Sequence, residues 1–218
     1  MAVKKQLLLF LGSIAFLFIA IFFIFPRFSE DTNDNFSDEP VVKEDGGFDS
    51  TGSKSGLWKG YYKNGNEAYH GNYQSGLKEG AWNYFTKDGK LFKHLTYNNG
   101  LKNGKVSIFS DGRLYDEISY TNGKKNGKHI HYSATGSVNY VQEYKNDSMS
   151  GEFIIYSATG KITQKGSLSD GKNVGEWRMY NDQGSLTEVN VFDTLTSTYR
   201  EIKFSLNGDT LSDKIVKQ

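Results

Sequence analysis

The chain contains two different patterns of hydrophobic residues. Residues 7–25 form one uncharged run interrupted only by Gly12 and Ser13, whereas residues 56–192 alternate short apolar and polar stretches. As a helix, the run would extend about 28 Å, which is close to the thickness of the hydrocarbon core of a bilayer. The sequence therefore predicts one transmembrane helix near the N-terminus, followed by a β-rich segment.

A cleaved signal peptide is the alternative interpretation of the run, because Ser13-x-Ala15 fits a small-x-small cleavage pattern. Residues 16–25 continue the apolar run beyond that site, so we expect residues 1–27 to be an uncleaved signal anchor. Two lysines precede the run and one arginine follows it, which places the N-terminus in the cytoplasm. The expected location is the inner (cytoplasmic) membrane, single-pass, with the rest of the chain periplasmic or extracellular.

Residues 28–55 are predicted to be a disordered acidic linker. Within them, residues 28–50 contain eight acidic side chains against one lysine, a net charge of −7, in a stretch rich in Ser, Asn and Gly. Such a composition buries too little apolar area to offset the entropy lost on ordering. Calcium capture is an alternative, but the carboxylates lack the fixed spacing of a calcium-binding loop.

Residues 56–192 contain six copies of a unit of 23 or 24 residues. In each unit a glycine comes first, a bulky residue or histidine follows two positions later, an aromatic ring five positions later, and a turn glycine after that. The first glycines are Gly56, Gly80, Gly104, Gly127, Gly151 and Gly175. Each unit is typical of two short strands. The expected fold class is all-β, an elongated and twisted antiparallel meander of about six β-hairpins, with residues 193–218 as a C-terminal capping hairpin.

Turn chemistry predicts the pairing within a unit. In the second unit, a three-residue Lys-Asp-Gly loop with a left-handed glycine sets Phe85 opposite Leu91. The third unit is one residue shorter, and its two-residue Asp-Gly loop sets Phe109 opposite Leu114. The same pair of an aromatic and an aliphatic residue is therefore expected in both units.

Alternation along the strands predicts two faces of the sheet. One face is expected to pack the following side chains together: Tyr61, Phe85, Phe109, Tyr132, Tyr156, Tyr180, Leu91, Leu95, Leu114, Ile118, Val138, Ile162 and Leu186. The other face is expected to carry Trp58, Trp82, Trp177, Tyr84, Ile108, Phe153, Ile155, Met179 and all four histidines, His70, His94, His129 and His131. On this second face Trp58 should lie opposite His70, and Trp82 opposite His94. The candidate partner-binding residues are Trp58, Trp82, Tyr84, His70, His94, Phe153 and Trp177.

The run Tyr73-x-x-Gly76-x-x-x-Gly80-x-Trp82-x-x-Phe85-x-x-x-Gly89 is echoed at residues 97–112 and 120–136, and it resembles the variant form of the MORN repeat. The resemblance covers residues 56–192. Many bacterial proteins with this variant repeat are labelled antitoxin components. The wider family is associated with protein assembly and, in eukaryotes, with binding to membrane surfaces. The resemblance implies a repeated hairpin fold and a binding role.

Motifs for catalysis are absent from the sequence. None of its Gly-Lys pairs is followed by Ser or Thr, and it has no G-x-S-x-G elbow and no H-E-x-x-H helix. The lack of cysteine excludes a disulfide scaffold, a thiolate metal site and a cysteine nucleophile. Scattered carboxylates such as Asp116 are expected on solvated strand faces. We therefore expect no enzyme activity and no cofactor.

His129 and His131 are weak candidates for metal ligands, because they project from the same face of one strand. No further ligand is evident nearby in the sequence. The alternative is degeneration of the fourth unit, which also has Asp147 in place of a turn glycine.

Charge argues against a nucleic-acid partner. The formal total of +1 divides into +3 for residues 1–27, −7 for residues 28–50 and +5 for residues 51–218. The +5 is mild and diffuse, whereas nucleic-acid binding calls for a concentrated basic surface.

Three functions remain open. The favoured one is a membrane-anchored, non-catalytic scaffold, held in the bilayer by residues 7–25, whose repeats bind another cell-envelope protein. Trp and Tyr, which are common in interface hot spots, support it. The second is a module that binds glycans or lipid headgroups by stacking on aromatic rows, which requires Trp58, Trp82 and Trp177 to be exposed. The third is antitoxin-like neutralisation of a partner protein.

Overall fold

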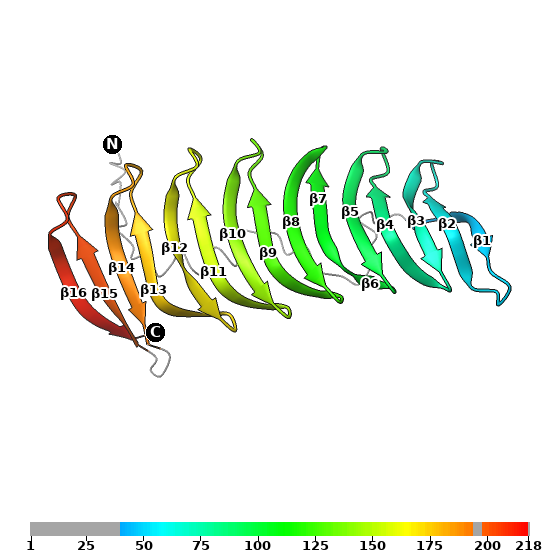
Figure 1. Ribbon diagram of the computed structural model, residues 1–218. Coiled ribbons are helices and arrows are strands. Elements are labelled where there is room, and N and C mark those ends of the chain that lie inside the picture. Colours follow the sequence, from blue (N-terminus) through cyan, green and yellow to red (C-terminus); the bar gives the residue numbers. More distant parts are fainter. Residues whose placement is uncertain (1–39, 194–197, 218) are drawn as a thin grey trace, which may run out of the picture. The chain divides into compact units, whose positions relative to one another are not determined.

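The computed structural model describes residues 40–193 and 198–217, and their strands form one antiparallel sheet. The strands are β1 (Lys43–Phe48), β2 (Lys54–Tyr61), β3 (Glu67–Gln74), β4 (Leu77–Phe85), β5 (Leu91–Asn98), β6 (Leu101–Lys102), β7 (Gly104–Ser110), β8 (Arg113–Thr121), β9 (Lys124–Tyr132), β10 (Val138–Lys145), β11 (Ser148–Tyr156), β12 (Ile162–Ser169), β13 (Lys172–Tyr180), β14 (Leu186–Phe192), β15 (Thr198–Phe204) and β16 (Thr210–Lys217). Neighbours in the chain are neighbours in the sheet, except that the short β6 pairs only with β5 (Figure 1). The prediction of an all-β antiparallel meander is confirmed for these residues.

The predicted membrane anchor lies outside the residues that the structure describes. Residues 1–27, with the apolar run at residues 7–25, lie outside the described ranges, as do residues 28–39 of the predicted linker. Within the described ranges, no helix is long and apolar enough to cross a membrane.

β1 lies inside the segment predicted to be a linker. It pairs with β2, and the ring of Phe48 packs edge-on against Trp58 at 5.2 Å between centroids. The indole N–H of Trp58 also donates a hydrogen bond to the carbonyl oxygen of Gly47 at 3.0 Å. Sheet structure therefore begins before the first repeat, because backbone pairing and one aromatic contact hold a strand that is otherwise polar.

The predicted pairs beside the loops are present. Phe85 lies opposite Leu91 and Phe109 opposite Leu114. In the longer loop, Gly89 has a φ of 81°, the left-handed conformation that the turn requires. The shortened loop of the third unit therefore leaves the pairing unchanged, as predicted.

A β-bulge follows each of these pairs and alters the rest of the register. Between β4 and β5, the pair Phe85–Leu91 is followed by Tyr84–Lys93, so that Phe92 is an extra residue on β5. The same kind of shift occurs beside the corresponding loops of the other units. One extra residue transfers every later side chain of that strand to the other face.

The bulges make the predicted tryptophan–histidine pairs wrong. Trp58 lies opposite Gly71, one residue beyond His70. Trp82 lies opposite Leu95, one residue beyond His94. Both errors have the same cause, because the prediction continued the loop register without an extra residue.

The pairing assigns the two faces. The Trp face carries Trp58, Tyr69, Tyr73, Trp82, Tyr84, Leu95, Tyr97, Val106, Ile108, Asp116, Ile118, Tyr120, His129, His131, Tyr140, Tyr144, Phe153, Ile155, Trp177 and Met179. The opposite face, here the band face, carries a row that we call the band: Tyr61, Phe85, Leu91, Phe109, Leu114, Tyr132, Val138, Tyr156, Ile162, Tyr180 and Leu186. The predicted division was wrong for Leu95 and Ile118, which lie on the Trp face, and for His70 and His94, which lie on the band face.

The Trp face holds the core. Trp82 and Leu95 are fully buried, and Trp177 is 1% exposed. Each tryptophan packs over a glycine of the preceding strand, where a side chain would leave no room. A Cβ atom on that glycine would lie 2.1–2.3 Å from the indole in the pairs Gly46–Trp58, Gly71–Trp82 and Gly166–Trp177. Each indole N–H also donates to a backbone carbonyl of that strand, at 3.0 to 3.1 Å. These Trp–Gly pairs therefore lock neighbouring strands together.

Candidate interaction surfaces

The tryptophans named as partner-binding candidates are core residues. Trp58 is 4% exposed, Trp82 0% and Trp177 1%, and Tyr84 beside them is 3% exposed. Phe153 is partly buried on the same face. The exposure that glycan stacking on the three indoles would require is therefore absent.

A row of lysines runs over the Trp face. Four lysines occupy the same repeat position, two residues before the first glycine of a unit: Lys54, Lys78, Lys102 and Lys125. Their ammonium groups lie over ring centroids, at 3.9 Å from Trp58, 4.6 Å from Trp82, 5.5 Å from Tyr120 and 4.8 Å from Tyr144, respectively. Such cation–π contacts orient a positive charge along a ring face. The sequence prediction missed this lysine row, although the repeat alignment contains the signal.

One carboxylate from the predicted linker already binds this row. Glu44, on β1, accepts a hydrogen bond from Lys54 Nζ at 2.6 Å and another from the Tyr69 hydroxyl. Burial acts to raise the pKa of Glu44, but these two hydrogen bonds and the charges of Lys54 and Lys78 outweigh it, so that the pKa is lowered. The site therefore favours an ionised carboxylate.

A second cluster on the Trp face joins both metal-ligand candidates to Asp116. His129 Nε2 lies 2.7 Å and His131 Nδ1 lies 3.0 Å from the same oxygen, Asp116 Oδ1. Because an ionised carboxylate only accepts hydrogen bonds, each imidazole donates a hydrogen bond to it through a ring N–H. Asp116 is 9% exposed and His131 4%, so the prediction of a solvated Asp116 was wrong.

The cluster is a buried hydrogen-bonded centre. Burial acts to raise the pKa of Asp116, but the hydrogen bonds from His129 and His131 outweigh it and lower the pKa. Among residues 40–193 and 198–217, no group of three or more His, Asp or Glu side chains is arranged to hold a metal ion. The two hydrogen bonds hold both imidazoles against one carboxylate on the Trp face.

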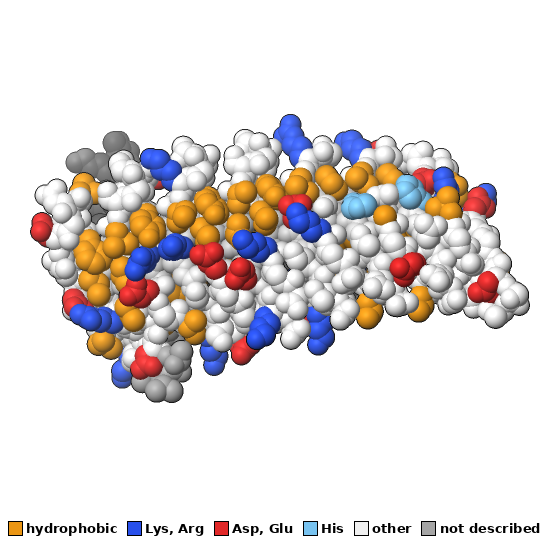
Figure 2. Space-filling model, in the orientation of Figure 1, with side chains coloured by type: hydrophobic (Ala, Val, Ile, Leu, Met, Phe, Trp, Pro, Cys, Tyr) orange, Lys and Arg blue, Asp and Glu red, His pale blue; other side chains and the backbone are white. Residues whose placement is uncertain are grey.

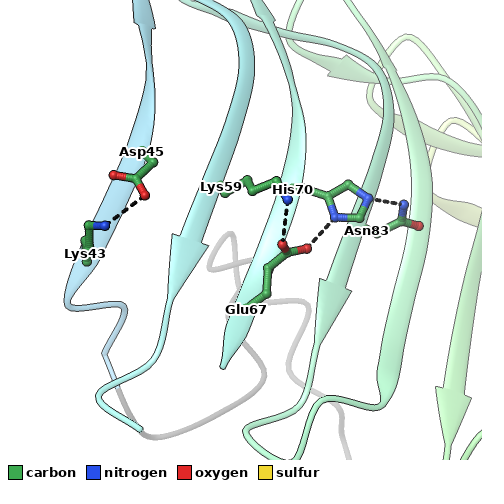
Figure 3. Close-up of polar contacts among 6 residues, drawn as sticks. All are labelled: Lys43, Asp45, Lys59, Glu67, His70 and Asn83. Atoms are coloured by element: carbon green, nitrogen blue, oxygen red, sulfur yellow. Dashed lines mark hydrogen bonds and ion pairs between the residues drawn. The ribbon is translucent and has the colours of Figure 1, made fainter. Parts of the chain in front are cut away.

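On the band face, a chain of polar contacts crosses β2 to β5, and Figure 3 shows its part from Lys59 to Asn83. Lys59 Nζ lies 3.2 Å from Glu67, whose other oxygen accepts a hydrogen bond from His70 Nδ1. Asn83 then donates to His70 Nε2 at 2.8 Å, and His94 Nδ1 donates to Asn83 Oδ1 at 2.7 Å. The two histidines proposed as tryptophan partners are therefore joined to each other through one amide.

The band lies beside this polar chain and continues along the sheet. Its side chains are partly exposed, and Figure 2 shows hydrophobic side chains that follow one another across the strands, with charged groups next to them. An open hollow of about 200 Å³ lies on this face, lined by Glu152, Lys165, Gly166, Ser167, Glu176 and Arg178. Arg178 pairs with Glu176 at 2.7 Å, so charged groups in the hollow already partner one another.

No protein-family model matches this chain, and no curated protein matches it.

Proposed function

We propose that the chain is a membrane-anchored, non-catalytic repeat scaffold whose band face binds another protein of the cell envelope. The observation that carries this proposal is the band itself. It presents partly exposed aromatic and aliphatic side chains across successive hairpins (Figure 2), and apolar rings bordered by polar groups are typical of the centre of protein interfaces.

The different exposure of the tryptophans and of the band supports the same interpretation. The three tryptophans of the Trp face are buried in the core, whereas every ring of the band keeps part of its surface accessible to a partner. The buried indoles offer no stacking platform, which disfavours the glycan or lipid-headgroup alternative. The resemblance of residues 56–192 to variant MORN repeats also supports a binding role. Residues 7–25 would hold the scaffold in the inner membrane, with its repeats in the periplasm or outside the cell.

The test is a pull-down of the full chain from detergent-solubilised membranes. We expect Phe109→Ser combined with Tyr156→Ser to reduce recovery of a stoichiometric protein partner by about tenfold or more, because two interface rings contribute at least 1.4 kcal/mol between them. Leu77→Ser combined with Leu101→Ser is the matched control, since these leucines are 48% and 50% exposed and lie outside the band.

Circular dichroism establishes that both double variants are folded. A folded band variant that keeps its protein partner would refute the proposal. Recovery of glycan or lipid alone by the wild-type chain would refute it as well.

A further inference from the structure

The sheet ends in two edge strands that differ in how they are protected. β1 has six residues, includes Gly46 and Gly47, and carries a bulge between Asp45 and Gly47. Bulges and short length discourage an edge strand from pairing with another chain, and glycine weakens a strand. β16, at the other end of the sheet (Figure 1), has eight residues and contains neither glycine nor proline. Among the described residues, no strand pairs with its outer edge.

The backbone of β16 is regular along most of its length. It pairs with β15 residue by residue from Ser212 to Lys217, and the bulge residue Leu211 lies next to the loop. Ile215, in the middle of the regular part, is 68% exposed. A long and regular edge strand with exposed apolar side chains is a template for a further strand.

The charges in the middle of β16 already have partners on β15. Asp213 accepts two hydrogen bonds from Arg200, from Nε at 2.8 Å and from Nη2 at 2.5 Å. Lys214 Nζ lies 3.0 Å from the carboxylate of Glu201, which is 8% exposed. Charged side chains protect an edge because a second strand would have to desolvate them. Since β15 neutralises both charges, this protection is reduced.

The sequence of β16 is complementary to itself in one antiparallel register. A two-fold axis that keeps the faces of two joined sheets aligned is centred on one residue, which then lies opposite its own copy. Centring on Asp213 or Lys214 sets like charges opposite each other, and centring on Val216 sets Ile215 opposite Lys217. Centring on Ile215 sets this side chain opposite its copy and Asp213 opposite Lys217 on both sides of it.

We propose that β16 pairs with β16 of a second copy of this chain, antiparallel and centred on Ile215, to form one continuous sheet. The pairing satisfies backbone groups along the edge, covers part of Ile215 and adds two ion pairs between Asp213 and Lys217. These three side chains lie on the band face. Because the symmetry keeps the faces aligned, the bands of both copies lie on the same side of the joined sheet. This inference does not depend on the identity of any band-face partner.

A single introduced cysteine tests the centre of the pairing, because the chain has none of its own. Opposite Cα atoms of antiparallel strands are about 4.5–5.5 Å apart, which a disulfide can span. We expect the full chain with Ile215→Cys, oxidised mildly in detergent micelles, to form a linked dimer about tenfold faster than the chain with Leu206→Cys. Leu206 is the matched control, since it is 79% exposed and lies in the loop between β15 and β16.

Two further cysteine variants test the register. A thiol at position 213 of one copy should face a thiol at position 217 of the other. Each position lies four residue steps from its own copy, or about 13 Å, which is too far for a disulfide. A mixture of the Asp213→Cys and Lys217→Cys chains should therefore form a linked dimer that neither chain forms alone.

A charge at the centre of the pairing gives a second measurement. Adding Ile215→Lys to both chains of this mixture should reduce the yield of linked dimer by about tenfold, because like charges then lie directly opposite each other. Adding Leu206→Lys should leave the yield unchanged. Circular dichroism establishes that each variant keeps its β-sheet.

Three results would overturn the proposal. The first is equal rates of linkage for Ile215→Cys and Leu206→Cys. The second is a mixture that forms no linked dimer, or one whose yield Ile215→Lys leaves unchanged in folded chains. The third is linkage of the Ile215→Cys chain to a different protein in oxidised membranes, which would assign this edge to another partner.

Discussion

Trp82→Ala is expected to lower the free energy of unfolding by about 4 kcal/mol, within the range for removal of a buried aromatic side chain. Trp82 is fully buried, it packs edge-on against Tyr73 at 5.0 Å, and its indole N–H donates to the carbonyl oxygen of Asn72 at 3.1 Å. The mutation removes all these contacts and leaves a cavity above Gly71. Urea unfolding followed by far-ultraviolet circular dichroism measures the loss.

A double-mutant cycle tests whether the tight fit over glycine is the cause. Gly71→Ala alone should lower the free energy of unfolding by about 2 kcal/mol, because the added Cβ would lie 2.1 Å from Trp82 Cδ2. In the Trp82→Ala background the same change should cost almost nothing. Gly47→Ala is the matched control, since its Cβ meets only the Ser55 carbonyl oxygen at 3.4 Å. If Gly71→Ala lowered the free energy of unfolding equally in both backgrounds, contact with the Trp82 ring would not be the cause of its effect.

Asp116→Asn is expected to lower the free energy of unfolding by about 3 kcal/mol at pH 7, because it removes the buried negative charge that two hydrogen bonds share. The Asp116 carboxylate accepts hydrogen bonds from both His129 and His131. Both imidazoles bond the same oxygen, Oδ1, which an amide keeps, but the amide lacks the negative charge that strengthens both hydrogen bonds and buries an NH₂ group in place of Oδ2. Asp111→Asn is the control, since its side chain is 88% exposed, and its effect should stay within about 0.5 kcal/mol.

The Asp116 contribution should also depend on pH. Because folding lowers the pKa of this carboxyl from its usual 3.8, its stabilisation is present above the unfolded pKa. It is lost as the pH falls through the lower folded pKa. The difference between wild type and Asp116→Asn should therefore shrink below about pH 4. A difference that stays constant from pH 7 to pH 2 would contradict the role assigned to the carboxylate.

The hairpins could be predicted because their signals are local. Turn glycines and loop lengths determine the first pair beside each loop, and they are sufficient for Phe85 opposite Leu91. The bulge at Phe92 has no such signal, since an extra aromatic residue in a strand resembles any other strand residue. It depends on how the whole hairpin packs its rings on the Trp face, and the assignment of His70 and His94 failed for that reason.

The candidate sites were harder to predict because their partners come from other strands. Asp116 and His131 are 15 residues apart in the chain and meet only through the pairing of β8 with β9. Glu44 lies in a segment with the composition of a linker, and nothing in that composition indicated that its carboxylate would bind Lys54 on the Trp face. The lysine row was visible in the repeat alignment, but its meaning depends on the rings beneath each ammonium group.

The order of pairing in the sheet has a consequence for how the chain acquires its structure. Apart from β6, every strand pairs with the strands before and after it in the chain, so contacts join residues close in sequence. A hairpin that has just emerged from a ribosome or a translocation channel already has its docking template in the hairpin made before it. Such a domain can fold progressively from its N-terminal end, one repeat at a time, without exposing a completed but unpaired set of strands.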